Sequence, residues 1–169
     1  MTRYENYPAW IVIVANALSL AIYSIGSIVV VRLGLQWLLI YLAFILVLEL
    51  RLLGKSCVHC YYYGKRCAFG KGKLCSLFFK KGEAPERFYN KKITWKELIP
   101  EMLVPFTPII IGIILLINQF EWLLLLFIFV LFLLTSAGNG FVRSALACKY
   151  CKQQEVGCPA SNFFLKKDS

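Results

Sequence analysis

The sequence predicts an all-α integral membrane protein in which four transmembrane helices form two repeated hairpins, each followed by a cytosolic cysteine segment. Three observations predict this fold class. Hydrophobic residues make up 59% of the chain and charged residues 17%, whereas a soluble domain carries about 25% charged residues. The chain contains four long apolar runs, and one cysteine spacing occurs twice. This composition excludes an ordinary soluble enzyme, a disordered tail and a collagen-like rod.

The first, second and fourth apolar runs are long enough to cross a bilayer, which takes about 20 residues of helix. They extend from about residue 9 to 31, from 33 to 53 and from 122 to 142. Only Arg3 is basic before the first run, and no small-residue cleavage site follows it. We therefore expect a retained helix there and not a signal peptide.

The third run, from about residue 102 to 117, is shorter. It reaches full length if the helix begins near Trp95, where Thr94 and Glu97 match a capping box. The longer helix then contains three prolines, where we expect kinks or a break. They are Pro100, Pro105 and Pro108.

Basic residues orient these helices. Residues 51–100 hold twelve of the nineteen Lys and Arg residues, and the chain after residue 142 holds five. The two short turns, near residues 32–34 and 118–121, hold one between them. The positive-inside rule therefore places both termini and all cysteines on the cytoplasmic side of the cell membrane. We expect the basic side chains to bind anionic lipid headgroups there.

Two cysteine triads have the spacing C-x2-C-x6-C and lie 91 residues apart. The first triad is Cys57, Cys60 and Cys67, and the second is Cys148, Cys151 and Cys158. Two apolar runs precede each triad, and a Phe-Phe pair with lysines follows it. We therefore expect two copies of one unit, residues 1–82 and 94–169, joined by a basic interfacial linker at 83–93. Each copy crosses the membrane twice, so the pseudo-two-fold axis should follow the membrane normal. Chance similarity between apolar sequences is the alternative.

Metal binding is the role that we expect for the triads. Disulfides are not favoured on the reducing side of the membrane unless the source is hyperthermophilic. Structural thiols would be scattered through the apolar runs, whereas all seven cysteines lie in polar segments. Two thiolates in a C-x2-C turn can bind one ion, and thiolate-rich sites suit zinc or iron–sulfur clusters. Because the spacing matches neither common ferredoxin pattern, we expect zinc, with an iron–sulfur cluster as the alternative.

The repeated C-x2-C-x6-C pattern resembles the two-zinc, six-cysteine clusters of fungal transcription factors. The resemblance implies that two halves wrap around two zinc ions with approximate two-fold symmetry. It also implies that the first cysteine of each half, here Cys57 and Cys148, bridges both ions. It covers about two dozen residues, and the halves lie about 80 residues apart with two membrane crossings between them. DNA binding therefore does not carry over, and we expect no nucleic-acid partner.

Two further residues are candidate ligands. Cys75 extends the first triad to C-x2-C-x6-C-x7-C and has no cysteine counterpart in the second copy. A closed four-cysteine site in the first copy, with a three-ligand site in the second, is therefore an alternative to a binuclear site. His59 is a candidate to complete the three-ligand site, although side chains inside a C-x2-C turn usually point outward.

Three polar residues near the ends of the second and fourth runs form a candidate intramembrane polar site. They are Glu49, Asn139 and Arg143. Glu49 and Arg143 either pair across the bundle or extend separately to the interface. We expect no catalytic residue of the common hydrolase kinds, because the chain has one histidine and its one aspartate is Asp168.

These observations predict a non-catalytic membrane protein in which a zinc–thiolate cluster holds the two copies together. The cluster would dock a protein partner, or a second copy of the chain, at the cytoplasmic face. Two alternatives stay open at this point. One is an iron–sulfur subunit that transfers electrons, with Glu49 handling protons, and the other is a small transporter or metal-ion handler.

Overall fold

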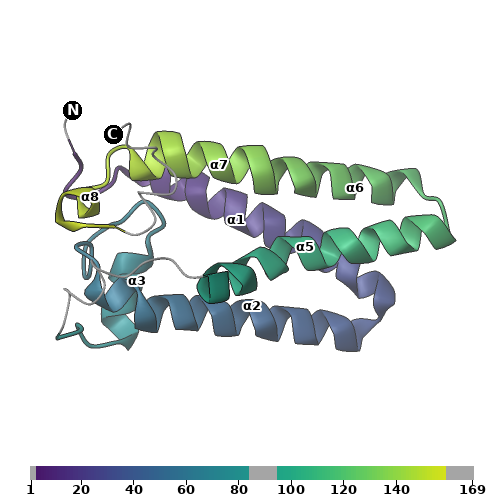
Figure 1. The fold of residues 1–169 in the computed structure, drawn as a ribbon, viewed down its shortest axis with the longest axis horizontal. Coiled ribbons are helices and arrows are strands. Elements are labelled where there is room, and N and C mark those ends of the chain that lie inside the picture. The colour runs from purple at the N-terminus through teal and green to yellow at the C-terminus, as the bar shows by residue number, and fades with distance from the viewer. Residues whose placement is uncertain (1–2, 84–94, 159–169) are drawn as a thin grey trace. The chain divides into compact units, whose positions relative to one another are not determined.

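The computed structural model describes residues 3–83 and 95–158. Four helices in these ranges are long and apolar enough to cross a membrane (Figure 1). They are Ala9–Leu33, Leu35–His59, Ile99–Asn118 and Trp122–Cys148. The described ranges contain no β-strand, only an isolated parallel bridge between Tyr4 and Cys151. The prediction of an all-helical protein with four candidate membrane spans is therefore confirmed.

The first hairpin consists of α1 (Ala9–Val30) and α2 (Leu35–Lys55), joined by the short η1 (Val31–Leu33). Gly34 ends the turn with a φ of 119°, a conformation that glycine adopts readily because it has no Cβ. After α2, the chain forms η2 (Cys57–His59) and then α3 (Lys71–Phe78).

The third span is α5 (Trp95–Asn118), which begins at the predicted residue. The helix continues through all three prolines without a break, and the kinks that were the other expected outcome stay a prediction. Transmembrane helices tolerate proline because neighbouring groups satisfy the freed backbone atoms. Thr94, part of the predicted capping box, lies outside the described residues.

The fourth span extends further than predicted. It consists of α6 (Trp122–Leu133), the π-helical η3 (Leu134–Gly138), α7 (Asn139–Phe141) and the π-helical η4 (Val142–Cys148). Thr135 and Ser136 each donate a hydrogen bond of 2.6 Å to the carbonyl oxygen four residues earlier. Such bonds compete with the regular helical pattern, and π segments occur where that pattern is disturbed. The span ends at Cys148, the first cysteine of the second triad.

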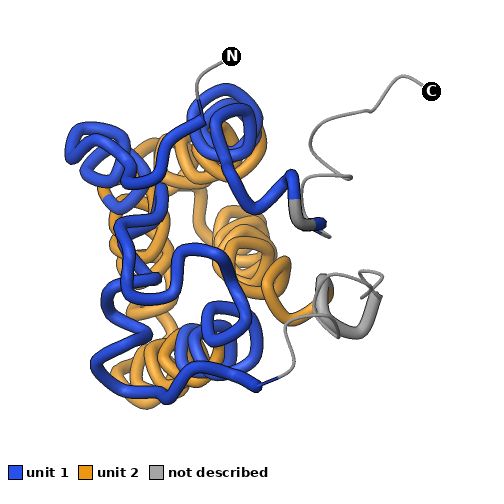
Figure 2. Tube along the Cα trace, turned by 90° about the vertical axis from the view of Figure 1, so that its left-hand side faces the viewer, with its two compact units in different colours: residues 1–16, 49–94, 140–169 blue, residues 17–48, 95–139 orange. Residues whose placement is uncertain are grey.

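The chain forms two compact units (Figure 2). Unit 1 contains Met1–Asn16, Glu49–Thr94 and Gly140–Ser169, and unit 2 contains Ala17–Leu48 and Trp95–Asn139. Each unit therefore takes residues from both predicted copies, 1–82 and 94–169. All seven cysteines belong to unit 1.

Unit 2 packs the two helices of each hairpin closely against each other. A Cβ added at Gly26 would lie 2.5 Å from the Tyr41 hydroxyl oxygen, and one at Gly112 would lie 2.7 Å from Ile128. Small residues allow helices to approach this closely in membrane proteins. Tyr41 also donates a 3.0 Å hydrogen bond to the carbonyl oxygen of Val104.

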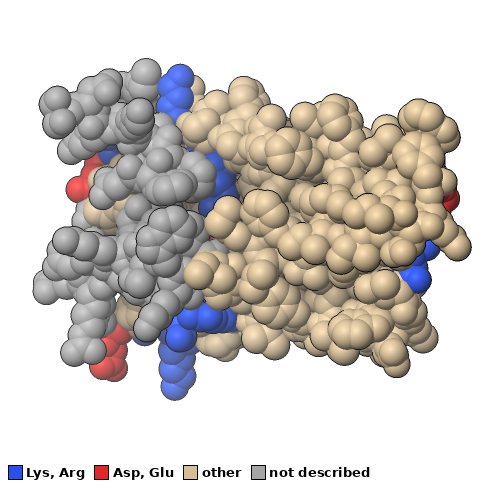
Figure 3. Space-filling view, turned by 45° about the vertical axis from the view of Figure 1, so that its right-hand side comes forward, with Lys and Arg blue, Asp and Glu red and all other residues tan. Residues whose placement is uncertain are grey.

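Charged residues are sparse in unit 2. Arg32 and Glu121 are the only charged residues in 17–48 and 102–139. They form an ion pair of 3.2 Å between the two hairpin turns. The turns therefore lie at one end of this unit. Figure 3 shows a broad surface without charged side chains over the helices on the face that it draws. Such a surface suits contact with lipid.

Candidate metal centre

The core of unit 1 is built largely from aromatic side chains. Tyr7 and Tyr62 are each 1% exposed, and the half-buried Cys60, Cys67 and Cys151 pack against this cluster. Three segments meet there. They are the N-terminal segment (residues 3–8), the first cysteine segment (57–67) and the second cysteine segment (148–158).

The first cysteine segment begins with a tight turn. The Cys60 amide donates to the carbonyl oxygen of Cys57 (3.2 Å), and the Tyr63 amide donates to that of Cys60 (3.0 Å). Helix α3 packs against this turn. The Gly64 amide donates a hydrogen bond to the Gly72 carbonyl oxygen of α3 (3.0 Å). A Cβ at Gly72 would overlap the backbone of Tyr62, so the close contact requires glycine.

The second cysteine segment repeats this turn at the equivalent residues. The Cys151 amide donates to the carbonyl oxygen of Cys148 (3.1 Å), and the Gln154 amide donates to that of Cys151 (3.3 Å). A short helix, α8 (Gln153–Val156), follows. The two triads thus have the same local backbone pattern in unit 1.

Two buried side chains join the cysteine segments to each other. The side-chain oxygen of Gln153 accepts a hydrogen bond from the Tyr61 amide (2.5 Å). In the reverse direction, the Tyr62 hydroxyl accepts one from the Lys152 amide (3.0 Å). Tyr62 and Gln153 are each 1% exposed. Sequence reasoning missed both residues, because neither Tyr nor Gln beside a cysteine signals a contact with a distant segment.

The N-terminal segment binds both cysteine segments. The Tyr4 amide donates to the Tyr150 carbonyl oxygen (3.2 Å), and the Tyr7 amide donates to that of Arg66 (3.0 Å). The Tyr7 hydroxyl donates to the Ala147 carbonyl oxygen (2.5 Å). Burial, followed by the nearby Cys151 thiol, raises the pKa of Tyr7, so this hydroxyl keeps its proton. No sequence motif marked this segment as part of the site.

Ion pairs add to these contacts. Lys152 pairs with Glu5 at 2.7 Å, and Arg3 pairs with Glu155 at 3.1 Å. The hydrogen bond and charge of Lys152 lower the pKa of the Glu5 carboxyl. Both pairs therefore connect the N-terminal segment to the second cysteine segment, although solvent screens them.

Thiols of the two triads influence one another's pKa values. Burial raises the pKa of Cys60 to about 12. The thiols of Cys151, Cys67 and Cys158 also contribute to that increase, whereas a hydrogen bond from the Tyr62 backbone lowers it. Burial likewise raises the pKa of Cys151, while the Gln153 backbone lowers it and the Cys158 and Cys67 thiols raise it. Thiols separated by more than 80 residues in the sequence therefore interact.

The first cysteine of each triad interacts with thiols of its own segment. Cys57 interacts electrostatically with Cys67, Cys60 and Cys75, and Cys148 interacts with Cys151 and Cys158. All seven cysteines lie in the described ranges and are free thiols. Within residues 3–83 and 95–158, no three His, Cys, Asp or Glu side chains converge closely enough to hold a metal ion as they stand.

Cys75 occupies a different environment. It is 0% exposed and packs with Leu53 and Val58. Its thiol donates to the Leu53 carbonyl oxygen at 3.5 Å, and burial, then the Cys67 thiol, raises its pKa. These contacts are typical of a structural thiol inside a core.

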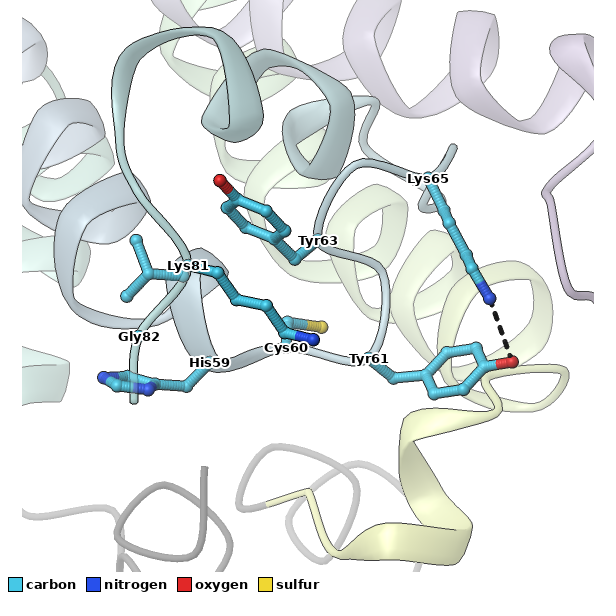
Figure 4. A pocket seen from close by; sticks show the side chains of 8 residues that line it. His59, Cys60, Tyr61, Tyr63, Lys65, Lys81 and Gly82 are labelled. Carbon is cyan, nitrogen blue, oxygen red and sulfur yellow. Dashed lines mark hydrogen bonds between the residues drawn. The ribbon is translucent and has the colours of Figure 1, made fainter. Parts of the chain in front are cut away.

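His59 lines a pocket of about 310 Å³ beside Cys60 (Figure 4). Its imidazole lies against Gly82, and its Nδ1 is buried without a hydrogen-bond partner among the described residues. Lys65 and Lys81 also line the pocket. Figure 4 shows the Lys81 side chain extending toward Cys60, and Lys65 donates to the Tyr61 hydroxyl at 3.3 Å.

The predicted intramembrane polar residues are divided between the units. Glu49 forms an ion pair of 2.6 Å with Lys71, the first residue of α3. The Arg143 guanidinium lies 5.5 Å from the ring centre of Phe69. Glu49 and Arg143 both belong to unit 1, whereas Asn139 belongs to unit 2. Pairing between Glu49 and Arg143 stays a prediction, and the contact with Lys71 was not foreseen.

Unit 1 therefore brings the two predicted triads together around buried Tyr62 and Gln153. The structure adds the N-terminal segment, which the sequence did not indicate. No protein-family model, curated protein or solved structure matches this chain.

Proposed function

We propose that this is an integral membrane protein whose two cysteine segments bind zinc at the cytoplasmic membrane face. The metal serves to hold the segments together as a platform for a protein partner or a second copy of the chain. The observation that carries this proposal is the pair of hydrogen bonds that joins the two cysteine segments, from the Tyr61 amide to Gln153 and from the Lys152 amide to Tyr62. We assign no catalytic step to the centre.

Backbone donors support a role for the sulfur atoms as thiolates. Burial raises the pKa of the Cys60 and Cys151 thiols, and hydrogen bonds from the backbones of Tyr62 and Gln153 offset part of that increase. The Gly72 amide donates to the Cys67 sulfur at 3.4 Å. Hydrogen bonds of this kind favour the charged form of an acceptor. Without a cation, several buried thiolates would repel one another, and a divalent metal ion removes that cost.

Zinc suits a structural centre in unit 1. The buried apolar residues that surround the triads are few, and a small core of this kind rarely stabilises a domain alone. Structural zinc contributes directly to the free energy of folding. It would link the two cysteine segments, which are otherwise joined to each other by hydrogen bonds.

Elemental analysis of the protein, purified anaerobically in detergent, tests the proposed metal. We expect colourless protein with stoichiometric zinc, and loss of zinc in Cys60→Ser but not in Cys75→Ser, the matched control. Brown protein with stoichiometric iron and sulfide would instead establish the iron–sulfur alternative. Protein without bound metal, purified in the absence of chelators, would overturn the proposal.

The proposed orientation follows from charge. Twelve basic residues in 51–100 and five after residue 142 account for seventeen of nineteen, which the positive-inside rule assigns to the cytoplasm. A membrane-impermeant maleimide should therefore label the cysteines only after cells are opened and metal is removed. Labelling in intact cells would reverse the orientation.

The pocket at His59 supports anionic lipid as a second partner. Lys65, Lys81 and His59 line it without a carboxylate among the lining residues. Basic groups near a membrane surface each contribute about 1 kcal/mol of attraction to anionic lipid. In nanodiscs, anionic phosphatidylglycerol should raise the unfolding temperature of the wild type more than that of Lys81→Gln. Equal responses would exclude this pocket as the lipid site.

The proposed duplication is supported by the repeated turns. Each hydrogen bond of the first turn, Cys60 to Cys57 and Tyr63 to Cys60, has a counterpart 91 residues later. We propose that residues 1–82 and 94–169 are two copies of one ancestral unit.

A further inference from the structure

We propose that helix α3 is an interfacial anchor, which lies in the headgroup region of the membrane and inserts Leu74, Leu77 and Phe78 among the acyl chains of lipid. We call these three side chains the apolar face of α3. This inference rests on the proposed membrane insertion of the protein and is independent of metal binding. It gives the first cysteine segment a direct attachment to the bilayer.

The apolar face of α3 is strongly exposed. Leu74 is 45% exposed, Leu77 73% and Phe78 71%. Side chains three and four residues apart lie on the same side of a helix, so these three form one stripe. Gly72 and Cys75, on the other side of α3, are buried. A stripe of large apolar side chains exposed beside a buried face indicates a contact surface.

Two side-chain contacts hold α3 against the end of α2 (Figure 1). Lys71 forms an ion pair of 2.6 Å with Glu49, and the Cys75 thiol donates to the Leu53 carbonyl oxygen at 3.5 Å. Glu49 and Leu53 both belong to the candidate span Leu35–His59. Helix α3 therefore lies at the level of the last turns of that span, where hydrocarbon gives way to headgroups.

The ion pair fixes α3 at this level. A carboxylate inside a membrane span is costly and needs a partner. The side chains of Lys71 and Glu49 are 25% and 29% exposed, so both charges are partly shielded from solvent. The long stem of a lysine allows its charge to reach such a position while the rest of the residue packs on apolar surface. Pairing therefore draws the first residue of α3 to the depth of Glu49.

Basic residues border the apolar face. Lys73, Lys80 and Lys81 are all exposed, and residues 50–82 contain no Asp or Glu. Anionic headgroups attract basic side chains close to a membrane surface. An exposed apolar stripe with lysines beside it is typical of a helix that lies in the interface plane. The charge of this segment is thus complementary to an anionic lipid surface.

Lipid suits this face better than a second copy of the chain does. A stable protein interface buries about 800 Å² on each partner and involves about 20–30 residues. The apolar face offers three side chains, and its lysines would repel their counterparts in a symmetric dimer. Acyl chains set no such minimum area, because the lipid that surrounds the spans extends to α3.

Photocrosslinking from α3 in the full-length protein tests the proposal. Phe78 is replaced by p-benzoyl-phenylalanine, which on illumination forms a bond with a nearby C–H group and leaves every cysteine in place. The protein is reconstituted in vesicles of phosphatidylcholine and phosphatidylglycerol. Mass spectrometry of the intact protein should show an increase by the mass of one phospholipid. A covalent dimer in denaturing electrophoresis would overturn the proposal in favour of a second copy.

Two reference positions carry the same probe. Phe129, 58% exposed on α6, lies in a candidate span and should crosslink to lipid. Glu155, exposed on α8 and paired with Arg3, should not. Lipid crosslinks from Phe129 without any from Phe78, or equal yields from Phe78 and Glu155, would overturn this inference alone. The absence of lipid crosslinks from both phenylalanine positions would refute membrane insertion itself.

Hydrogen exchange gives a second readout without a probe. In nanodiscs of the same lipids, Leu77→Gln should raise the exchange rates of the α3 amides by about tenfold, because glutamine is costly to place among acyl chains. Leu77→Met is the matched control, since it keeps an apolar side chain of similar size, and it should exchange like the wild type. Equal exchange rates in both variants and the wild type would contradict insertion of this face.

Discussion

The two cysteine segments of unit 1 form the same turn but are stabilised by different neighbours. The first segment packs against α3, where Gly72 allows close approach to Tyr62. The N-terminal segment contacts both segments, but its Tyr7 hydroxyl and its two ion pairs go to the second. The spacing of the cysteines therefore specifies the local turn, whereas each turn packs against a different set of neighbouring residues. Substitutions in those neighbours should separate the two segments experimentally.

The largest effect is expected from Gly72→Ala. The added Cβ would overlap the backbone of Tyr62, and a rigid backbone cannot move aside as a flexible side chain can. Overpacking of this kind costs about 3 kcal/mol. Thermal unfolding in detergent should show a large drop, with the first-triad cysteines becoming reactive to maleimide before the second triad.

Gly140→Ala is the matched control for Gly72→Ala. Nothing lies within 4 Å of a Cβ added at Gly140, and alanine is the better helix former. Its unfolding temperature should be unchanged or slightly higher. Equal destabilisation by both substitutions would contradict the view that the contact between α3 and Tyr62 supports the first segment.

Tyr62→Phe and Gln153→Met test the bonds that join the segments. The first removes the acceptor of the Lys152 amide and the donor to the Tyr4 carbonyl oxygen. The second removes the acceptor of the Tyr61 amide and the donor to the Gly157 carbonyl oxygen. An unsatisfied buried amide costs about 1–3 kcal/mol, so we expect similar losses of about 2 kcal/mol in each variant. Chemical denaturation should give the two values.

A marked inequality between these variants would show that the two bonds are not equivalent. Tyr63→Phe serves as the control. The Tyr63 hydroxyl donates a hydrogen bond to the Phe79 carbonyl oxygen, which does not involve the second cysteine segment. It should leave maleimide labelling of the second triad unchanged, whereas Tyr62→Phe should accelerate labelling in both triads.

Tyr7→Phe should weaken the second segment selectively. It removes the hydrogen bond to the Ala147 carbonyl oxygen and the contact with the Cys151 thiol. The ring stays buried, so the loss should be about 1 kcal/mol. Mass spectrometry after brief maleimide labelling should show faster modification of the second triad. Faster modification confined to the first triad would contradict the assigned role of the N-terminal segment.

The smallest effect is expected from Glu5→Gln. Lys152 lowers the pKa of Glu5 below its ordinary value of 4.5. A carboxyl with a lowered pKa stabilises the folded protein above its ordinary pKa, and this contribution is lost as the pH falls below it. Exposed ion pairs contribute little. The variant should therefore unfold slightly more easily at pH 7, with the difference shrinking as the pH falls below 4.5.

The ends of the membrane spans show which features the sequence predicts and which it does not. The start of α5 at Trp95 was predicted, because apolar length and a capping pattern are local properties. The end of the fourth span at Cys148 was missed by six residues, since hydroxyl bonds from Thr135 and Ser136 belong to backbone geometry that hydropathy does not report. The triads were found by spacing. The roles of Tyr62, Gln153 and the N-terminal segment were not, because their partners lie far along the chain.

The sequence by itself determined the four apolar spans, the position of the charges and the two cysteine turns, because each depends on residues close together in the chain. Only the tertiary structure decided which thiols become neighbours and which side chains join the segments. The Tyr61 amide meets Gln153 across 92 residues, and such a contact arises from packing of the whole unit. The physical reason is that the spacing of nearby residues determines the turn, whereas burial in the folded unit determines which distant segment the turn contacts.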